Sequence, residues 1–295
     1  MTTMRSSPGG AGRASSHAPP ASMALGERQP LSFAEKWPYP MWIAHRGAGM
    51  FAPENTLAAF RVGALHGHRA FECDVKLSAD GVPFLLHDAE LERTSSGKGT
   101  ASHLNWHELS RLDAGRWHGR GFAGEPLPSL DGIAAYCIAN GFALNIEIKP
   151  TPGDESRTGR VVAARAAHLW ANEAVPPLIS AFHPEALRSA RGAAPYLPRA
   201  LLLETLRNGW FEAAQALGCV AVVTHHPVMN AALIAKLHGA NMRALVYTVN
   251  DAAEAQRLEA LGVDGIITDA VDRFFPAPSS MCPEPASRQP AAQLR

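Results

Sequence analysis

Cysteine is scarce in this chain. The 295 residues include only Cys73, Cys137, Cys219 and Cys282, and no two of them form a C-x-x-C pair. A disulfide scaffold or a zinc site built on paired cysteines is therefore not expected. We predict that the first three are buried free thiols, that Cys282 lies in a polar tail, and that the protein works in a reducing cytoplasm.

A surplus of charge is also missing, because 27 basic residues balance 27 acidic ones. Without a long-range field we expect no nucleic-acid partner, and any recognition of phosphate has to be local. No run of about 18 apolar residues occurs, which predicts no transmembrane helix and no stable membrane insertion. No apolar stretch follows Arg5 and Arg13, so we expect no secretory signal. The sequence does not indicate the oligomeric state.

Both ends of the chain have little that could form a core. Residues 1–36 and 277–295 are rich in Gly, Pro and Ser, and such segments bury too little apolar surface to offset their ordering entropy. We predict that both are disordered and that residues 37–276 form one folded domain. A transit peptide is the alternative for the first segment, because it contains Arg and Ser and few acids.

The central region alternates between two kinds of segment. Short apolar runs, bounded mostly by Gly, Pro, Asn or Asp, are typical of parallel strands buried on both faces. The runs are Met41–His45, Ala70–Val75, Phe142–Ile148, Leu178–Phe182, Ala200–Leu203, Cys219–Thr224, Ala244–Val249 and Gly265–Thr268. Helical spacing follows several of them. Within 56–66, for example, it predicts an inward stripe of Leu57, Phe60, Ala64 and Leu65.

Eight strands alternating with helices predict a (β/α)8 TIM barrel. The gap between the second and third strands is too long for one crossover helix. Pro83–His87 within it has the pattern of an extra strand, so we predict a small inserted subdomain after the second strand, at about residues 83–128. A doubly wound sheet is the alternative fold, but no G-x-G-x-x-G follows a strand, which leaves dinucleotide binding without support.

Acidic side chains gather at the carboxyl ends of the predicted strands, where barrel enzymes carry their catalytic groups. Glu72 and Asp74 lie two residues apart on one strand and therefore face the same way, while Glu147 ends the next strand. Three carboxylates in one barrel mouth would repel one another unless a cation joined them, and oxygen ligands suit Mg²⁺, Ca²⁺ or Mn²⁺. Pairing with Arg or Lys is the alternative that needs no metal.

Histidines and basic residues accompany these acids. His45 and His87 follow strands and can exchange protons near neutral pH. Arg46 offers a bidentate fork for phosphate oxygens, and Lys149 a point charge. Each histidine could instead be an ordinary hydrogen-bonded one, and each basic group could simply neutralise its acidic neighbours.

The same residues occur in stretches that resemble the glycerophosphodiester phosphodiesterase family, over about Trp42 to Asp269. The similar stretches are His45–Gly47, Pro53–Leu57, Glu72–Val75, Asp80–Pro83, His87–Asp88, Leu91–Thr94, Glu147–Lys149, Tyr247–Asn250 and Asp264–Asp269. The chain is most similar to the cytosolic bacterial enzymes of glycerol-phosphate uptake. The resemblance implies a (β/α)8 barrel with an insertion, and hydrolysis of small glycerophosphodiesters to sn-glycerol 3-phosphate and an alcohol.

Roles for individual residues follow from the resemblance. It implies that Glu72, Asp74 and Glu147 hold one divalent cation, with Mg²⁺ as the first choice and Mn²⁺, Co²⁺ or Ca²⁺ as alternatives. It also implies His45 and His87 as the acid and base, and Arg46 and Lys149 on the phosphate. Glu54 is expected to support the metal site, and Phe182 and Tyr247 to form walls of the pocket. His225 and His226 could touch the leaving group or lie in a solvated loop.

Two other functions fit less well. A phospholipase or sphingomyelinase-D-like enzyme shares the barrel and its acid–base logic, but it has to reach lipid, and the sequence shows no amphipathic basic helix or lipidation motif. A barrel that only binds a phosphodiester would be expected to have lost a metal ligand or a histidine, and none is missing here.

Overall fold

The computed structural model describes residues 37–274, so the segments predicted to be disordered and Cys282 lie outside the described residues. The strands are β1 (Trp42–Ala44), β2 (Ala70–Leu77), β3 (Pro83–Leu85), β4 (Ala143–Ile148), β5 (Leu178–Ala181), β6 (Arg199–Leu203), β7 (Ala221–His225), β8 (Arg243–Tyr247) and β9 (Gly265–Thr268). The α-helices are α1 (Leu57–Leu65), α2 (Trp106–Leu109), α3 (Leu130–Ala139), α4 (Glu155–Leu169), α5 (Pro184–Ala193), α6 (Trp210–Ala216), α7 (Ala231–Gly239) and α8 (Ala252–Leu261). Short 3₁₀ turns are η1 (Gly49–Phe51), η2 (Ala101–His103), η3 (Arg120–Phe122) and η4 (His226–Val228).

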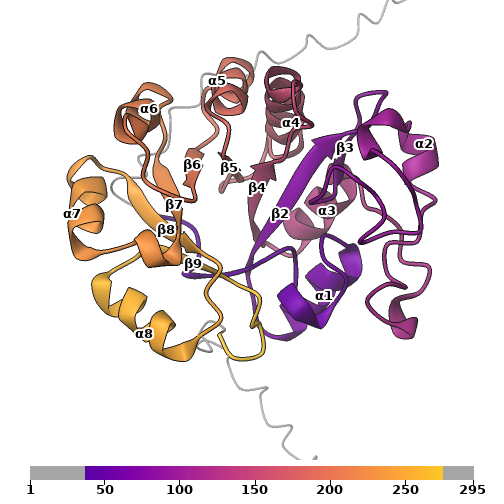
Figure 1. Ribbon diagram of the computed structural model, residues 1–295, viewed down its shortest axis with the longest axis horizontal. Coiled ribbons are helices and arrows are strands. Elements are labelled where there is room, and N and C mark those ends of the chain that lie inside the picture. Colours follow the sequence, from indigo (N-terminus) through magenta and orange to yellow (C-terminus); the bar gives the residue numbers. More distant parts are fainter. Residues whose placement is uncertain (1–36, 275–295) are drawn as a thin grey trace, which may run out of the picture. The chain divides into compact units, whose positions relative to one another are not determined.

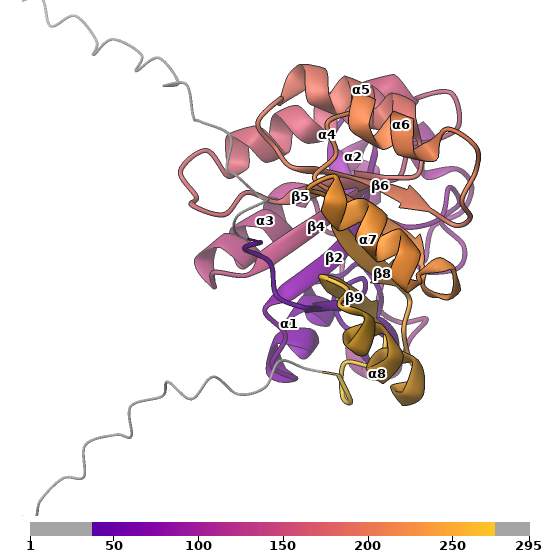
Figure 2. The ribbon, with the colours of Figure 1, turned by 90° about the vertical axis from the view of Figure 1, so that its left-hand side faces the viewer.

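Eight of these strands form a closed parallel barrel. The order runs from β1 through β9, β8, β7, β6, β5 and β4 to β2, and β1 also pairs with β2 at Ala44 and Phe71. Helices surround the ring of strands, as Figures 1 and 2 show from two directions. The predicted (β/α)8 TIM barrel is confirmed, and the doubly wound alternative is excluded by the closure.

The barrel is held by apolar side chains on both sides of its wall. Every residue of β2 is buried, which explains why the sequence shows unbroken apolar runs instead of alternation. One cluster fills the lower interior, and its members include Ile43, Leu202, Val223 and Leu245. A larger cluster lies between the strands and the helices. The acidic side chains of β2 and β4 lie beyond this interior cluster, toward the carboxyl ends of the strands.

The segment between β2 and α3 carries β3, η2, α2 and η3. β3 pairs antiparallel with the end of β2, with Val75 opposite Leu85 and Leu77 opposite Pro83. A third apolar cluster, separate from the two of the barrel, lies within this segment. Its buried members are Phe84, Leu86, Leu91, Ala101, Leu109, Ala114 and Leu127. Pairing with β2 places the residues that follow β3 beside the barrel mouth.

Helix α1 packs more closely on the barrel than its sequence indicates. Phe60 is buried as predicted, but Leu65 is 86% exposed, so its place in the inward stripe was wrong. Gly63 is buried instead, and a Cβ there would lie 2.1 Å from the carbonyl oxygen of Gly47. The close approach turns the helix so that Gly63, not Leu65, faces the loop after β1.

Cys73, Cys137 and Cys219 are buried free thiols, as predicted. Among the described residues, no helix is long and apolar enough to span a membrane.

Candidate active site

Three buried carboxylates meet at the mouth of the barrel. Asp74 of β2 pairs in register with Glu147 of β4, and Glu72 lies two residues before Asp74 on the same face. Each residue is less than 9% exposed, and the three offer carboxylate oxygens that all lie within 4.8 Å of one another. The sequence-based expectation that these acids converge is thus met by the geometry.

The cluster carries more negative charge than its surroundings balance. Burial raises the pKa of Glu72 to about 8, and the charge of Asp74 adds to the effect. Burial and Asp74 also raise the pKa of Glu147. Burial acts to raise the pKa of Asp74 as well, but Arg46 and Lys149 outweigh it and the pKa is lowered. Within residues 37–274, Glu72 Oε1 has no hydrogen-bond partner. The cluster is buried, offers only oxygen ligands and lacks positive charge. These properties fit a divalent cation.

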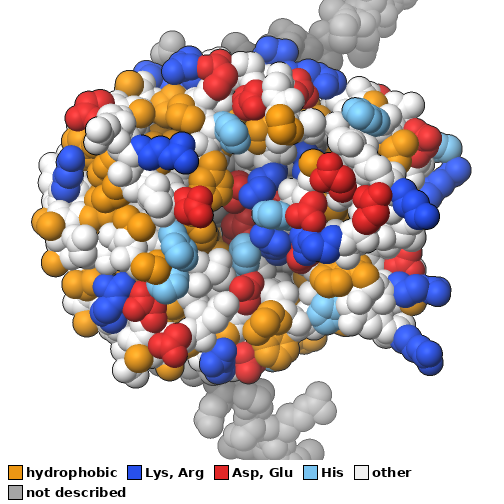
Figure 3. Space-filling model, in the orientation of Figure 1, with side chains coloured by type: hydrophobic (Ala, Val, Ile, Leu, Met, Phe, Trp, Pro, Cys, Tyr) orange, Lys and Arg blue, Asp and Glu red, His pale blue; other side chains and the backbone are white. Residues whose placement is uncertain are grey.

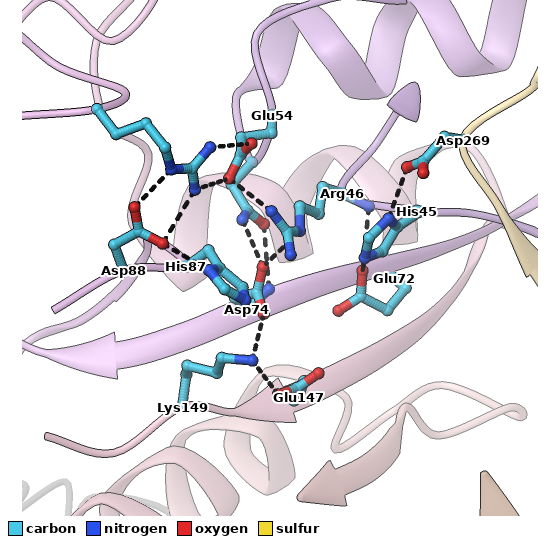
Figure 4. Close-up of polar contacts among 12 residues, drawn as sticks. His45, Arg46, Glu54, Glu72, Asp74, His87, Asp88, Glu147, Lys149 and Asp269 are labelled. Carbon is cyan, nitrogen blue, oxygen red and sulfur yellow. Dashed lines mark hydrogen bonds and ion pairs between the residues drawn. The ribbon is translucent and has the colours of Figure 1, made fainter. Parts of the chain in front are cut away.

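Arg46 and Lys149 lie directly beside these acids. Arg46 places Nε 3.2 Å from Asp74 and Nη1 2.8 Å from Glu54. Lys149 places Nζ 2.7 Å from Glu147 and 3.6 Å from Asp74. Both basic groups are therefore counterions in this structure, and both remain partly exposed at the mouth, where a phosphate could reach them (Figure 4).

His45 is held between β1 and β9. Its Nδ1 donates a hydrogen bond of 2.6 Å to Asp269, and its Nε2 lies 3.8 Å from Glu72. Burial acts to lower the pKa of His45, but the Asp269 hydrogen bond and the charge of Glu72 outweigh it, so the pKa is raised. Asp269 in turn accepts a hydrogen bond from the side-chain amide of Asn250 at 3.0 Å. The ring is thus fixed with Nε2 toward the carboxylates.

His87 follows β3 on the other side of the mouth. Its Nδ1 lies 2.7 Å from Asp88, and the buried Lys76 donates from Nζ to the backbone carbonyl of His87 at 3.1 Å and to that of Asp88. Burial lowers the pKa of His87, and the charges of Arg46 and Lys149 contribute to the shift. Burial also lowers the pKa of Lys76, to about 8. The two histidines therefore sit in opposite electrostatic settings.

A single arginine joins the two sides of the site. Arg93 donates to both carboxylate oxygens of Glu54 at 2.8 Å, and also to Asp88. Glu54 also binds Arg46, and Asp88 also binds His87 (Figure 4). Arg93 therefore links the loop after β1 to the loop after β3. Glu54 therefore contacts the arginines and does not contact the carboxylate cluster directly.

Several of these contacts were not predicted as functional. Asp269, Arg93 and Asn55 lie in stretches that carry the family resemblance, and Asn55 donates to Asp74 at 2.8 Å. Lys76 shares the face of Glu72 and Asp74 by strand periodicity, which was a usable signal. The partner of Asp269 was not predictable, because it depends on which residues meet where β9 closes against β1.

The remaining predicted residues lie on the opposite side of the mouth. Phe182 and Tyr247 meet edge to face with ring centroids 5.8 Å apart, and Lys149 Nζ lies 5.5 Å from the centroid of Phe182. His225 is exposed beside Tyr247, whereas His226 binds Glu254 of α8 at 2.6 Å. Figure 3 shows the hollow at the centre of this face, where acidic, basic and histidine side chains gather.

A TIM barrel with a buried acidic cluster, two histidines and basic groups at its mouth has the features of an enzyme that acts on charged substrates. The model of the glycerophosphoryl diester phosphodiesterase family matches residues 45–273, so the chain belongs to that family and is a glycerophosphodiester phosphodiesterase. The predicted family is thereby confirmed.

Individual relatives agree with this assignment. A glycerophosphodiester phosphodiesterase of Caldanaerobacter subterraneus is 32% identical over 235 residues, which cover 77% of this chain and 93% of the relative. A phosphodiesterase of Oleispira antarctica, solved with the product sn-glycerol-3-phosphate, matches with a TM-score of 0.74 and 32% identity over 79% of this chain and 94% of its own. A glycerophosphodiester phosphodiesterase of Agrobacterium tumefaciens matches with a TM-score of 0.67 and 28% identity, over 79% and 97%.

Proposed function

We propose that the protein hydrolyses small glycerophosphodiesters, such as glycerophosphocholine or glycerophosphoethanolamine, to sn-glycerol 3-phosphate and an alcohol. The observation that carries the proposal is the cluster of Glu72, Asp74 and Glu147 with His45 and His87 beside it. The product bound to the Oleispira relative supports the glycerol 3-phosphate half of the substrate.

The proposed cofactor is one divalent cation, Mg²⁺ first, held by Glu72, Asp74 and Glu147. When bound, such an ion supplies Lewis-acid polarisation of a phosphoryl oxygen and helps to orient the substrate. The unpartnered Oε1 of Glu72 and the raised pKa of its carboxyl support this role, because both mark a site that lacks positive charge.

Side chains of the protein transfer the protons and stabilise the negative charge on the phosphoryl group. Arg46 and Lys149 are placed to bind the equatorial phosphoryl oxygens and to stabilise the charge that develops on them. One histidine removes the proton of the nucleophile, and the other protonates the departing alcohol oxygen. Asp269 and Asp88 fix the two rings through their Nδ1 atoms, which leaves each Nε2 free for the transfer.

The proposal is tested by comparing product release by the metal-free protein with release after metal is added back. The protein is stripped with a chelator, and sn-glycerol 3-phosphate released from glycerophosphoethanolamine is measured with and without Mg²⁺. We expect release only with metal, and a much weaker response in Glu147→Gln. No release with Mg²⁺, Mn²⁺, Co²⁺ or Ca²⁺ from folded protein would reject the substrate class. Hydrolysis of intact lipid vesicles instead would favour the phospholipase alternative.

Two predictions accompany this function. We propose that residues 37–276 form the catalytic domain, with an insertion at about 83–128, and that the enzyme acts in the cytoplasm. The separate apolar cluster between β2 and α3 supports the limits of the insertion. Limited proteolysis followed by mass measurement of the surviving fragment tests the domain limits.

A further inference from the structure

The mouth of the barrel has two chemically different halves. The strands β1 to β4 and their loops supply the carboxylates, the histidines and the basic groups described above. The strands β5 to β8 supply a second set at their carboxyl ends, namely Phe182, Glu204, His225 and Tyr247, here called the rim. Phe182 and Tyr247 are expected to form pocket walls, His225 could touch the leaving group, and Glu204 adds a negative charge beside them.

Strand periodicity directs the rim toward the mouth. Leu202, Val223 and Leu245 belong to the cluster that fills the barrel interior. Residues two positions further along a strand face the same way, so Glu204, His225 and Tyr247 lie above that cluster. The same rule takes Leu178, also in the cluster, to Phe182 four positions later. The rim is therefore the top layer of the interior on this side.

Contacts within the rim make it one surface. Phe182 and Tyr247 meet edge to face at 5.8 Å, and the rings of His225 and Tyr247 lie 5.9 Å apart. The hydroxyl of Tyr247 donates to the carbonyl of Leu203, the residue before Glu204, at 3.4 Å. Burial raises the pKa of Tyr247 to about 12, and the charge of Glu204 adds to the shift. Since Glu204 directly follows the carbonyl that the Tyr247 hydroxyl contacts, its backbone lies beside the tyrosine.

The negative charge of Glu204 is free to interact with a ligand. Its side chain is exposed, and no ion pair or side-chain hydrogen bond within residues 37–274 occupies its carboxylate. Lys149, whose ammonium lies beside Phe182, is already paired with Glu147 and Asp74. The rim consequently combines three exposed or half-exposed aromatic rings with one uncompensated negative charge, next to the lysine expected to bind phosphate.

We propose that the rim binds the alcohol half of the substrate and selects an alcohol that carries an ammonium group, such as choline or ethanolamine. This inference rests on the proposed function. Ammonium groups are attracted to the faces of aromatic rings and to carboxylates, and a choline ammonium lies only two carbons from the ester oxygen. Lys149 shows that an ammonium is accommodated beside Phe182, at 5.5 Å from its centroid.

A hydroxyl-rich alcohol would gain less from the same surface. A sugar or inositol needs several matched donors and acceptors, because polar groups left unpaired on binding lose their hydration without return. The rim has few donors to offer, since the Tyr247 hydroxyl already donates to Leu203 and the side chains of Phe182 and ionised Glu204 have none. The predicted order of preference is therefore ammonium alcohols before neutral ones.

Charge can be tested separately from shape. The kcat/KM of the full-length, metal-loaded enzyme is measured for glycerophosphocholine and for the neutral ester in which carbon replaces the choline nitrogen. We expect glycerophosphocholine to be favoured by about tenfold. Glu204→Gln and Tyr247→Leu should bring the ratio of the two values close to one, whereas Tyr247→Phe, which keeps the ring, should preserve it.

Glu259→Gln is the matched control. Glu259 is exposed in the last turn of α8, at the end of the barrel away from the mouth, so its loss should leave the preference intact. Equal rates for the two esters in the wild type, or an unchanged ratio in Glu204→Gln, would overturn the inference. Hydrolysis of neither ester would overturn the proposed function instead. The rim would then be judged by calorimetric binding of tetramethylammonium, which must be weaker in Glu204→Gln.

Discussion

Asp269 holds the ring of His45 across the line where the barrel closes. Its Oδ1 lies 2.6 Å from Nδ1 of His45, and its Oδ2 is held by Asn250 at 3.0 Å. Asp269 directly follows β9 and His45 directly follows β1, so the pairing of these two strands sets the orientation of the ring. An anchored carboxylate of this kind fixes the tautomer and stabilises the charged form of its histidine.

Loss of that carboxylate should reduce turnover. Asp269→Asn is expected to lower kcat by about 10²-fold, with a smaller change in KM, because the amide no longer favours a proton on Nδ1. Asp272→Asn, at an exposed position three residues later, is the control and should retain activity. Normal kcat in Asp269→Asn with an unchanged melting temperature would show that the contact is only structural.

The histidines themselves can be removed one at a time. His45→Ala and His87→Ala should each lower kcat by about 10²–10⁴-fold, since each removes one proton-transfer group. The exposed His168 of α4 supplies the control, and His168→Ala should behave as wild type. A variant that turns over at the normal rate would exclude its histidine from the mechanism.

Binding of metal should release a proton near neutral pH. Burial raises the pKa of Glu72 to about 8, so the metal-free carboxyl is protonated below that pH and must lose its proton to bind an ion. Apparent Mg²⁺ affinity should therefore increase as pH rises toward 8 and level off above it. Calorimetric titration in buffers of different ionisation enthalpy counts the protons released. Release that does not diminish above about pH 8 would contradict the prediction.

Arg93 should matter for positioning rather than for binding of the substrate. Arg93→Met breaks the link between Glu54 and Asp88, and misplacement of His87 can then lower kcat by up to about 10²-fold, with KM less affected. Added guanidinium should restore part of the activity. Arg116→Met, which removes an arginine that is 78% exposed, should have no effect. A loss that guanidinium does not reverse, together with a lower melting temperature, would indicate a role in stability alone.

Replacement of two helical glycines by alanine should change the free energy of unfolding in opposite directions. Gly63→Ala forces a Cβ against the carbonyl oxygen of Gly47, and we expect a loss of about 1–3 kcal/mol in the free energy of unfolding. Gly192 of α5 has nothing within 4 Å of its would-be Cβ, so Gly192→Ala should stabilise the protein by roughly 0.5–1 kcal/mol. Denaturant unfolding measures both. Equal effects would refute the packing argument.

The sequence predicts those features that depend on local pattern. Runs buried on both faces gave the eight strands, and the two-residue spacing of Glu72 and Asp74 placed both acids on one face. Parallel strands align their carboxyl ends, so the sequence also predicted that Glu147 lies beside Glu72 and Asp74. Periodicity failed at Leu65, because the close contact between Gly63 and Gly47 sets the rotation of α1, and a helical wheel contains no information about it.

Contacts between distant loops could not be predicted from the sequence. The Arg93 link to Glu54 and Asp88 requires that the segment after β3 folds back over the loop after β1. The carbonyls that accept from Lys76 and the partner of His45 likewise depend on closure and on loop geometry. Their residue types were visible in the sequence, but their pairings are set by three-dimensional proximity.

The split of the mouth into a reacting half and a rim also bears on how such an enzyme can diversify. The carboxyl ends of β5 to β8 can exchange side chains without moving Glu72, Asp74 or either histidine, because those groups lie on β1 to β4 and the segments that follow them. A combinatorial library restricted to Phe182, Glu204, His225 and Tyr247 would therefore sample new leaving alcohols against a constant hydrolytic apparatus. Gene duplicates could diverge in the same way, with substitutions at four strand ends preceding any change in chemistry.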